Sequence, residues 1–175
     1  MFRSVDRIVE AIAKLLALMG GAVLLGIVIL TSLSIIGRAL VPLDIGIGPI
    51  RGIYDFTEIG MAIAIFAFLP LTQYNAAHAR VDLFQFAIPT FMSQLLDVIF
   101  QCAMFAVALI GTYRLYLGAM DKMSYGETTL IAQIPVWYGY VGSLIGGVGF
   151  ILVAAYCVIK TLGTLFGLSH QGDAS

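Results

Sequence analysis

The chain has 175 residues, of which 61% are hydrophobic and only 11% are charged, and its net charge is −1. Soluble domains carry about 25% charged residues, so this composition is typical of an integral membrane protein. Nine basic residues against ten acidic ones provide no positive field to attract a phosphate backbone, which excludes nucleic-acid binding.

Long uncharged stretches predict four membrane-spanning helices in a single domain, residues 1–175. The first stretch, between Lys14 and Arg38, is long enough to cross a hydrocarbon core of roughly 30 Å as a helix. The predicted spans are residues 15–37, 55–77, 91–118 and 135–159. The expected fold class is therefore all-α integral membrane.

Pro70 lies inside the second predicted span. Proline removes one backbone donor, so it predicts a kink in this helix. Thr72 and Gln73 follow closely, and we expect their side chains to satisfy backbone groups that the proline leaves free.

The most polar short segment follows the second span and contains His78, Arg80 and Asp82 among bulky apolar residues. It is too short to cross a bilayer. We therefore expect residues 79–89 to form an amphipathic interfacial helix that lies in the membrane plane between the second and third spans.

Asp97 and Arg114 are charged residues near opposite ends of the third predicted span. About 25 Å of helix separates them, so they do not pair with each other. We expect each to lie near one end of the span and to reach a headgroup region, Arg114 by extending its side chain along the helix.

Small residues four positions apart occur in the first and fourth spans and permit close helix packing. The pairs are Ala17 with Gly21, Ala22 with Gly26, and Gly142 with Gly146, and a neighbouring face of the fourth span carries Gly139, Ser143 and Gly147 at the same spacing. Two interpretations remain open from the sequence: packing within the chain, or a face for a partner protein.

Basic residues near the spans are slightly more numerous on the side that would hold both termini. That side carries Arg3, Arg7, Lys14, Arg80 and Lys160, and the opposite side carries Arg38, Arg51, Arg114 and Lys122. The positive-inside rule therefore favours cytoplasmic termini.

Residues that support catalysis or bind cofactors are sparse. Cys102 and Cys157 lie in apolar stretches, and we interpret both as small apolar helix residues. A haem held between spans commonly needs two histidines, but His78 is at a span edge and His170 is in the C-terminal tail. We therefore expect no enzyme activity, no catalytic residue, no metal site and no cofactor.

Several motifs around the second and fourth spans resemble a known family. They are Glu58 at the start of the second span, Leu69-Pro70 late in it, residues 78–83 (His-Ala-Arg-Val-Asp-Leu), Pro89, and residues 134–137 (Ile-Pro-Val-Trp). This pattern resembles the small membrane subunit, of the DctQ type, of tripartite ATP-independent periplasmic (TRAP) transporters. The likeness extends from the first span to the last.

The resemblance implies a four-helix bundle in the bacterial inner membrane, bound to a larger multi-spanning transport subunit. In such a complex the large subunit holds the substrate and sodium sites, and a periplasmic solute-binding protein delivers the substrate, commonly an organic acid anion. The small subunit would be a scaffold in contact with membrane lipid and part of the docking surface. The sequence does not identify the transported substrate.

The resemblance suggests partner contacts for a few residues. His78, Arg80 and Asp82 would fix the cytoplasmic end of the second span for assembly, or form an ordinary interfacial charge cluster. Glu58 lies one turn after Asp55 at the outer start of the second span. Acidic groups there either complement the helix dipole or contact basic groups on the binding protein. Gly142 and Gly146 are candidates for the contact with the large subunit.

Two other classes remain open from the sequence. The first is a membrane anchor subunit of a respiratory complex, which would share a quinone or haem site with partner subunits. The second is a small independent channel or transporter, although four spans without clear internal repeats do not favour it.

Overall fold

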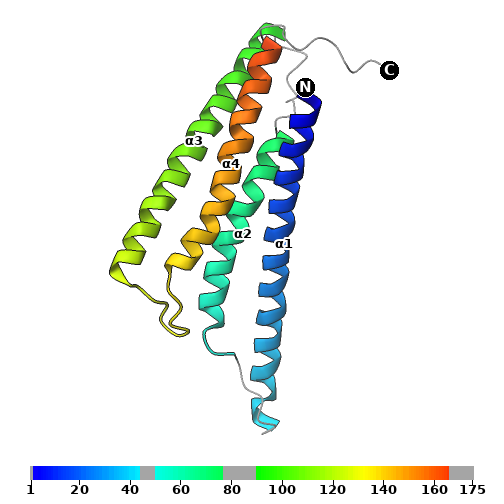
Figure 1. Cartoon of the computed structure of the whole chain (residues 1–175). Helices are drawn as coiled ribbons and strands as arrows, with labels where there is room; N and C mark the ends of the chain where they lie inside the picture. Colours follow the sequence, from blue (N-terminus) through cyan, green and yellow to red (C-terminus); the bar gives the residue numbers. More distant parts are fainter. Residues whose placement is uncertain (1, 44–49, 77–89, 166–175) are drawn as a thin grey trace.

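A computed structural model describes residues 2–43, 50–76 and 90–165, which form four long α-helices and one short 3-10 helix (Figure 1). The helices are α1 (Phe2–Leu40), η1 (Val41–Leu43), α2 (Ile53–Ala76), α3 (Thr90–Tyr125) and α4 (Trp137–Leu165). By length and composition each long helix suits a membrane span, so the predicted set of four apolar helices is confirmed. The predicted interfacial helix, residues 79–89, lies outside the described residues.

Two of the helices continue well beyond the predicted spans. α1 begins at Phe2, and its first turns contain a salt bridge of 2.5 Å from Lys14 to Glu10, an i,i+4 pair that supports helix in a polar stretch. α3 continues to Tyr125 and is followed by Gly126 at φ 63°, a left-handed residue that ends helices readily. Hydropathy therefore predicted the apolar part of each helix but not its full length.

The helices lie in an open row in the order α1, α2, α4, α3 (Figure 1). α2 and α4 pack along each other in the centre, while α1 packs on α2 and α3 packs on α4. α1 also touches α4, whereas α2 and α3 do not pack directly in the part of the chain that the structure describes. The four helices therefore form an open row in which α2 and α4 are central.

Glycine allows the two central helices to approach closely. A Cβ at Gly146 would lie 2.5 Å from the carbonyl oxygen of Phe66, and a Cβ at Gly142 would lie 2.6 Å from Ile63 Cδ1. Phe66 is four residues before Pro70, so the missing proline N–H leaves its carbonyl without the usual helical donor. α4 thus approaches the α2 backbone at the position that the proline modifies.

The close contact between α1 and α2 involves a different glycine from those predicted. A Cβ at Gly20 would lie 2.9 Å from Ala67 Cβ, whereas Gly21 and Gly26 have no such neighbour within 4 Å. Small-residue spacing identified the right helix and the buried Ala17, but Gly20 rather than Gly21 contacts α2. One residue corresponds to about 100° around a helix.

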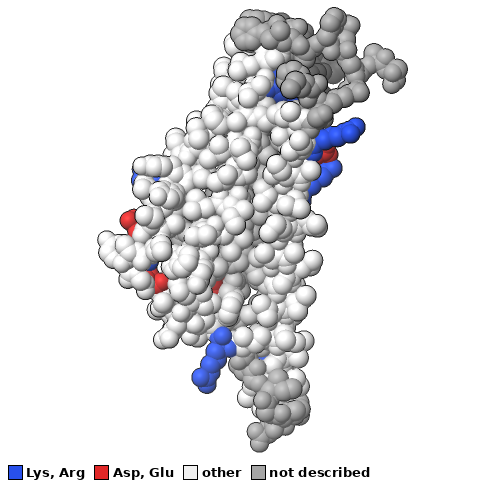
Figure 2. All heavy atoms as spheres, in the orientation of Figure 1, with Lys and Arg blue, Asp and Glu red and all other residues white. Residues whose placement is uncertain are grey.

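The buried core residues lie along the contacts between neighbouring helices of the row. Ala13, Tyr74, Val153 and Cys157 form one buried cluster where α1, α2 and α4 meet, and Ala108, Phe150 and Ala154 form another between α3 and α4. The outer helices expose many large apolar side chains, and Figure 2 shows that charged atoms are sparse on the viewed face. This distribution suits a lipid or protein environment around the row.

Candidate interaction sites

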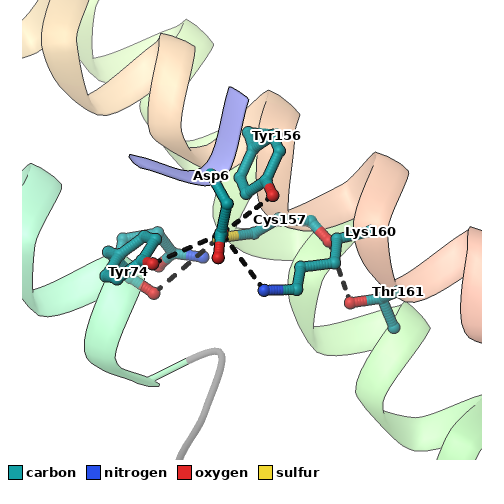
Figure 3. A network of polar contacts seen from close by, with 7 residues as sticks. Asp6, Tyr74, Tyr156, Cys157, Lys160 and Thr161 are labelled. Atoms are coloured by element: carbon teal, nitrogen blue, oxygen red, sulfur yellow. Dashed lines mark hydrogen bonds and ion pairs between the residues drawn. The ribbon is translucent and has the colours of Figure 1, made fainter. Parts of the chain in front are cut away.

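At the end of the row that holds the N-terminus, the carboxylate of Asp6 joins three helices (Figure 3). Asp6 Oδ1 accepts hydrogen bonds from Tyr156 OH at 2.8 Å, Lys160 Nζ at 3.2 Å and Tyr74 OH at 3.3 Å. Asp6 is on α1, Tyr74 is on α2, and Tyr156 and Lys160 are on α4. We call these four residues the Asp6 cluster.

The Asp6 cluster is well suited to a structural role. The Asp6 and Lys160 side chains remain 34% and 41% exposed, so water screens their ion pair and its contribution is modest. The two tyrosine hydroxyls restrict the position of the carboxylate, and Lys160 Nζ also lies 5.8 Å from the centre of the Tyr156 ring. The cluster therefore fixes the ends of α1, α2 and α4 relative to one another.

A second polar contact at this end connects helices that do not otherwise pack. Gln73 Nε2 on α2 donates a hydrogen bond of 2.7 Å to Gln101 Oε1 on α3. Gln73 is only 3% exposed, and its carbonyl oxygen lies 4.0 Å from the Cys157 thiol on α4. Buried amide hydrogen bonds of this kind stabilise helix association in membranes.

At the opposite end of the row, a loop of residues 126–136 connects α3 to α4 and has a hairpin-like form. Thr128 and Pro135 form an isolated bridge, and Thr129 N donates a hydrogen bond of 2.9 Å to Ile134 O. Lys122, in the last turn of α3, forms an ion pair with Glu127 at the start of the loop. We call this segment the α3–α4 loop.

Asp55 attaches the α3–α4 loop to the start of α2. Its side chain is buried, and its Oδ2 accepts hydrogen bonds from the backbone N–H groups of Ile131 (3.0 Å) and Ala132 (2.7 Å). Gly52 has φ 77°, and a Cβ there would lie 2.7 Å from Ala132 Cβ. The attached loop presents Leu130, 97% exposed, at its tip.

Glu58 lies one turn after Asp55 but is exposed and lines a cavity. The cavity has a volume of about 280 Å³ and lies among α2, α3 and α4. Its other lining residues are Ile59, Ala62, Phe66, Leu115, Val136, Gly139, Tyr140 and Ser143. Ser143 is 1% exposed, and its hydroxyl has no hydrogen-bond partner among the described residues.

The structure separates the residues that the sequence analysis had grouped. Asp55 is buried against the α3–α4 loop while Glu58 is exposed beside the cavity, so the two acidic groups do not form one surface. Gly142 and Gly146 lie at the contact between α2 and α4. Packing within the chain is therefore sufficient to explain why small residues occur at these two positions. A role for them at a partner interface stays a prediction.

The remaining predicted site residues, His78, Arg80 and Asp82, lie outside the described residues. The Asp6 cluster and the contact between Asp55 and the loop were not predicted from the sequence. A signal for the first was present: in an up-and-down helix arrangement, the start of α1 and the ends of α2 and α4 lie on the same side. Across residues 2–43, 50–76 and 90–165, no three His, Cys, Asp or Glu side chains form a metal site.

Four apolar helices of spanning length, joined at both ends by polar contacts, define a multi-pass membrane protein. The family model for tripartite ATP-independent periplasmic transporters, DctQ component, matches residues 27–164, from within α1 to near the end of α4. The chain therefore belongs to the DctQ family and is a small-subunit component of a TRAP transporter. No curated protein and no solved structure matches the chain.

Proposed function

We propose that this subunit is a non-enzymatic scaffold in the bacterial inner membrane. It holds a larger multi-spanning transport subunit and helps to dock a periplasmic solute-binding protein. In this proposal both termini are cytoplasmic, and the complex takes up an organic acid anion with sodium coupling.

The helix row is the observation that carries the scaffold proposal. Its central helices are fixed by glycine contacts at the α2–α4 seam and by the Asp6 cluster. Its outer helices leave wide apolar faces available: on α1, for example, Leu18 is 75% exposed and Leu25 is 65% exposed. A thin, internally braced row offers more lateral surface to lipid and to a partner than a closed bundle of the same helices.

The α3–α4 loop supports the docking part of the proposal. With cytoplasmic termini, the start of α2 and this loop lie on the periplasmic side. Asp55 holds the loop in a defined shape, and the exposed tip places Leu130 and Ile131 in water, where exposed apolar groups favour protein contact. The exposed carboxylate of Glu58 lies on the same end of α2 and is available to basic groups of a binding protein.

The test is capture of the tagged full-length chain from its native membranes in a mild detergent, with mass spectrometry of the proteins that accompany it. We expect one larger multi-spanning protein in stoichiometric amount. Proteoliposomes that contain both subunits, with the binding protein outside, should then accumulate labelled organic acid anions in response to an inward sodium gradient. A coloured complex with redox subunits, or uptake by this chain alone, would refute the scaffold proposal.

A further inference from the structure

Arg114 lies deeper in the helix row than the sequence analysis expected. α3 runs antiparallel to α4, and two contacts give their register: Thr112 lies against Gly147, and Tyr140 lies against Gly118. Arg114 falls between these contacts, level with residues 144–145 of α4. It is not near the end of α3, because this helix continues to Tyr125.

Arg114 has no other charged residue at its level on α3 or α4. The nearest charged residue along α3 is Asp121, two helical turns or about 10 Å away. Measured along the helix axis, Arg114 lies roughly 10 Å from the level of Trp137 at the start of α4. It lies roughly 23 Å from the level of Lys160 near the end of that helix. An arginine at such a depth is costly in lipid unless it meets water, a headgroup or an opposite charge.

Arg114 points away from the rest of the chain. It is exposed, and in the part of the chain that the structure describes it makes no ion pair and no hydrogen bond. Val107 (59% exposed), Ile110 (63%) and Leu117 (37%) share its helical face. The opposite face of α3 packs on α4. Its buried residues are Ala108, Thr112 and Ala119.

Extension of the side chain toward headgroups is unfavourable in this helix. The closer polar end of α3 is its C-terminal end, which carries Asp121 and Lys122. Side chains on a helix tilt toward its N-terminus, so Arg114 is directed toward the farther end and into the apolar region. The helix geometry therefore opposes the headgroup contact that the sequence analysis assigned to this residue.

We propose that Arg114 forms an ion pair with a carboxylate on a membrane-spanning helix of the large transport subunit. The apolar side chains of Val107, Ile110 and Leu117 then pack on that helix. The outer face of α3 is thus the surface of this subunit that contacts the large subunit. A protein carboxylate is the expected partner, because it complements the positive charge of the guanidinium, whereas lipid chains carry no anion at this depth. A guanidinium binds a carboxylate through two parallel hydrogen bonds, which also fixes the register of the two helices.

This inference rests on the proposed function, and its test separates the two. The tagged full-length chain is captured from native membranes as Arg114→Leu, Arg114→Glu and Arg114→Lys, beside wild type. Arg38→Leu, which removes an exposed arginine at the end of α1, is the matched control. We expect the Leu and Glu variants to retain at least tenfold less large subunit, Lys to retain an intermediate amount, and the Arg38 variant to behave as wild type.

A charge exchange gives the second measurement. Each acidic residue in the spans of the large subunit is replaced in turn by arginine and combined with Arg114→Glu. Recovery of the complex by one exchange supports the pair and identifies its acidic member.

Undiminished capture by both Arg114→Leu and Arg114→Glu would show that Arg114 is not needed for assembly and would overturn the inference, while the scaffold function would stand. Failure of every exchange to restore the complex would also overturn it. If the wild-type chain captures no large subunit, the proposed function itself is refuted.

Discussion

The central helices α2 and α4 and the outer helices α1 and α3 have similar apolar composition but very different surroundings. α2 and α4 meet at glycines, of which Gly146 lies against the α2 backbone, whereas α1 and α3 expose large apolar side chains along much of their length. Lipid is as apolar as leucine, so hydrophobicity alone does not decide which faces pack. Small residues and buried polar groups mark the packed faces, and large apolar residues mark the faces left for lipid or a partner.

The largest effect is expected at the central seam, for Gly146→Ala. The new methyl would meet the Phe66 carbonyl, a backbone group that cannot rotate away, so the helices must separate. Overpacking of this kind costs about 1–3 kcal/mol of folding free energy. Thermal unfolding of the purified chain in detergent measures the loss.

Gly26→Ala on α1 is the control, because nothing lies within 4 Å of the added group. It should unfold at or slightly above the wild-type temperature, since alanine favours helix over glycine. Equal unfolding temperatures for the two variants would contradict the difference between central and outer helices.

Asp55→Ala should release the α3–α4 loop while the helices remain packed. Two backbone N–H groups, of Ile131 and Ala132, would lose their acceptor, and the loop would open more often. Limited proteolysis should then cut within residues 126–136 roughly tenfold faster. Glu58→Ala, one turn away and exposed, should leave the cleavage rate unchanged. A similar rate in both variants would mean that Asp55 does not hold the loop.

Asp6→Asn should have a smaller effect. The amide oxygen still accepts hydrogen bonds from Tyr74 and Tyr156, so the variant loses mainly the screened ion pair with Lys160, worth under about 1 kcal/mol. A double-mutant cycle of Asp6→Asn with Lys160→Met, measured by thermal unfolding, isolates that pair. A coupling of zero would assign the whole contribution of the Asp6 cluster to the tyrosines.

The smallest effect on the isolated chain is expected for Leu25→Ala on α1. This side chain is 65% exposed, and surface substitutions usually change folding free energy by less than about 0.5 kcal/mol. Thermal unfolding should be nearly unchanged, and capture of the large subunit should remain at the wild-type level if α3 is the partner face. A loss of capture would assign partner contact to α1 instead.

The sequence predicted the number and apolar extent of the helices because a bilayer imposes one simple requirement on length and hydropathy. It did not predict their order in the row, since hydropathy contains no information on which face meets which. The one-residue difference between Gly21 and Gly20 shows this directly: both lie in the same apolar run, but only Gly20 faces α2.

The site was less predictable than the fold. Asp55 and Glu58 look equivalent as acidic residues in the first turns of a helix, and only the position of a loop more than 70 residues later distinguishes them. Arg114 was assigned to a helix end because the predicted span stopped at residue 118, whereas the helix continues to Tyr125. The role of Asp55 thus depends on a long-range contact, and the position of Arg114 depends on the full length of α3.

The order of the row has a consequence for biosynthesis. Among the described residues α3 packs on α4 and not on α1 or α2, and α4 follows α3 in synthesis. During synthesis α1 and α2 can pack on each other as soon as both are inserted. The polar Thr112 of α3, by contrast, stays exposed in the bilayer until α4 is inserted. In a chain truncated before Trp137, α3 therefore has no packing partner and is exposed to membrane proteases that degrade unassembled helices.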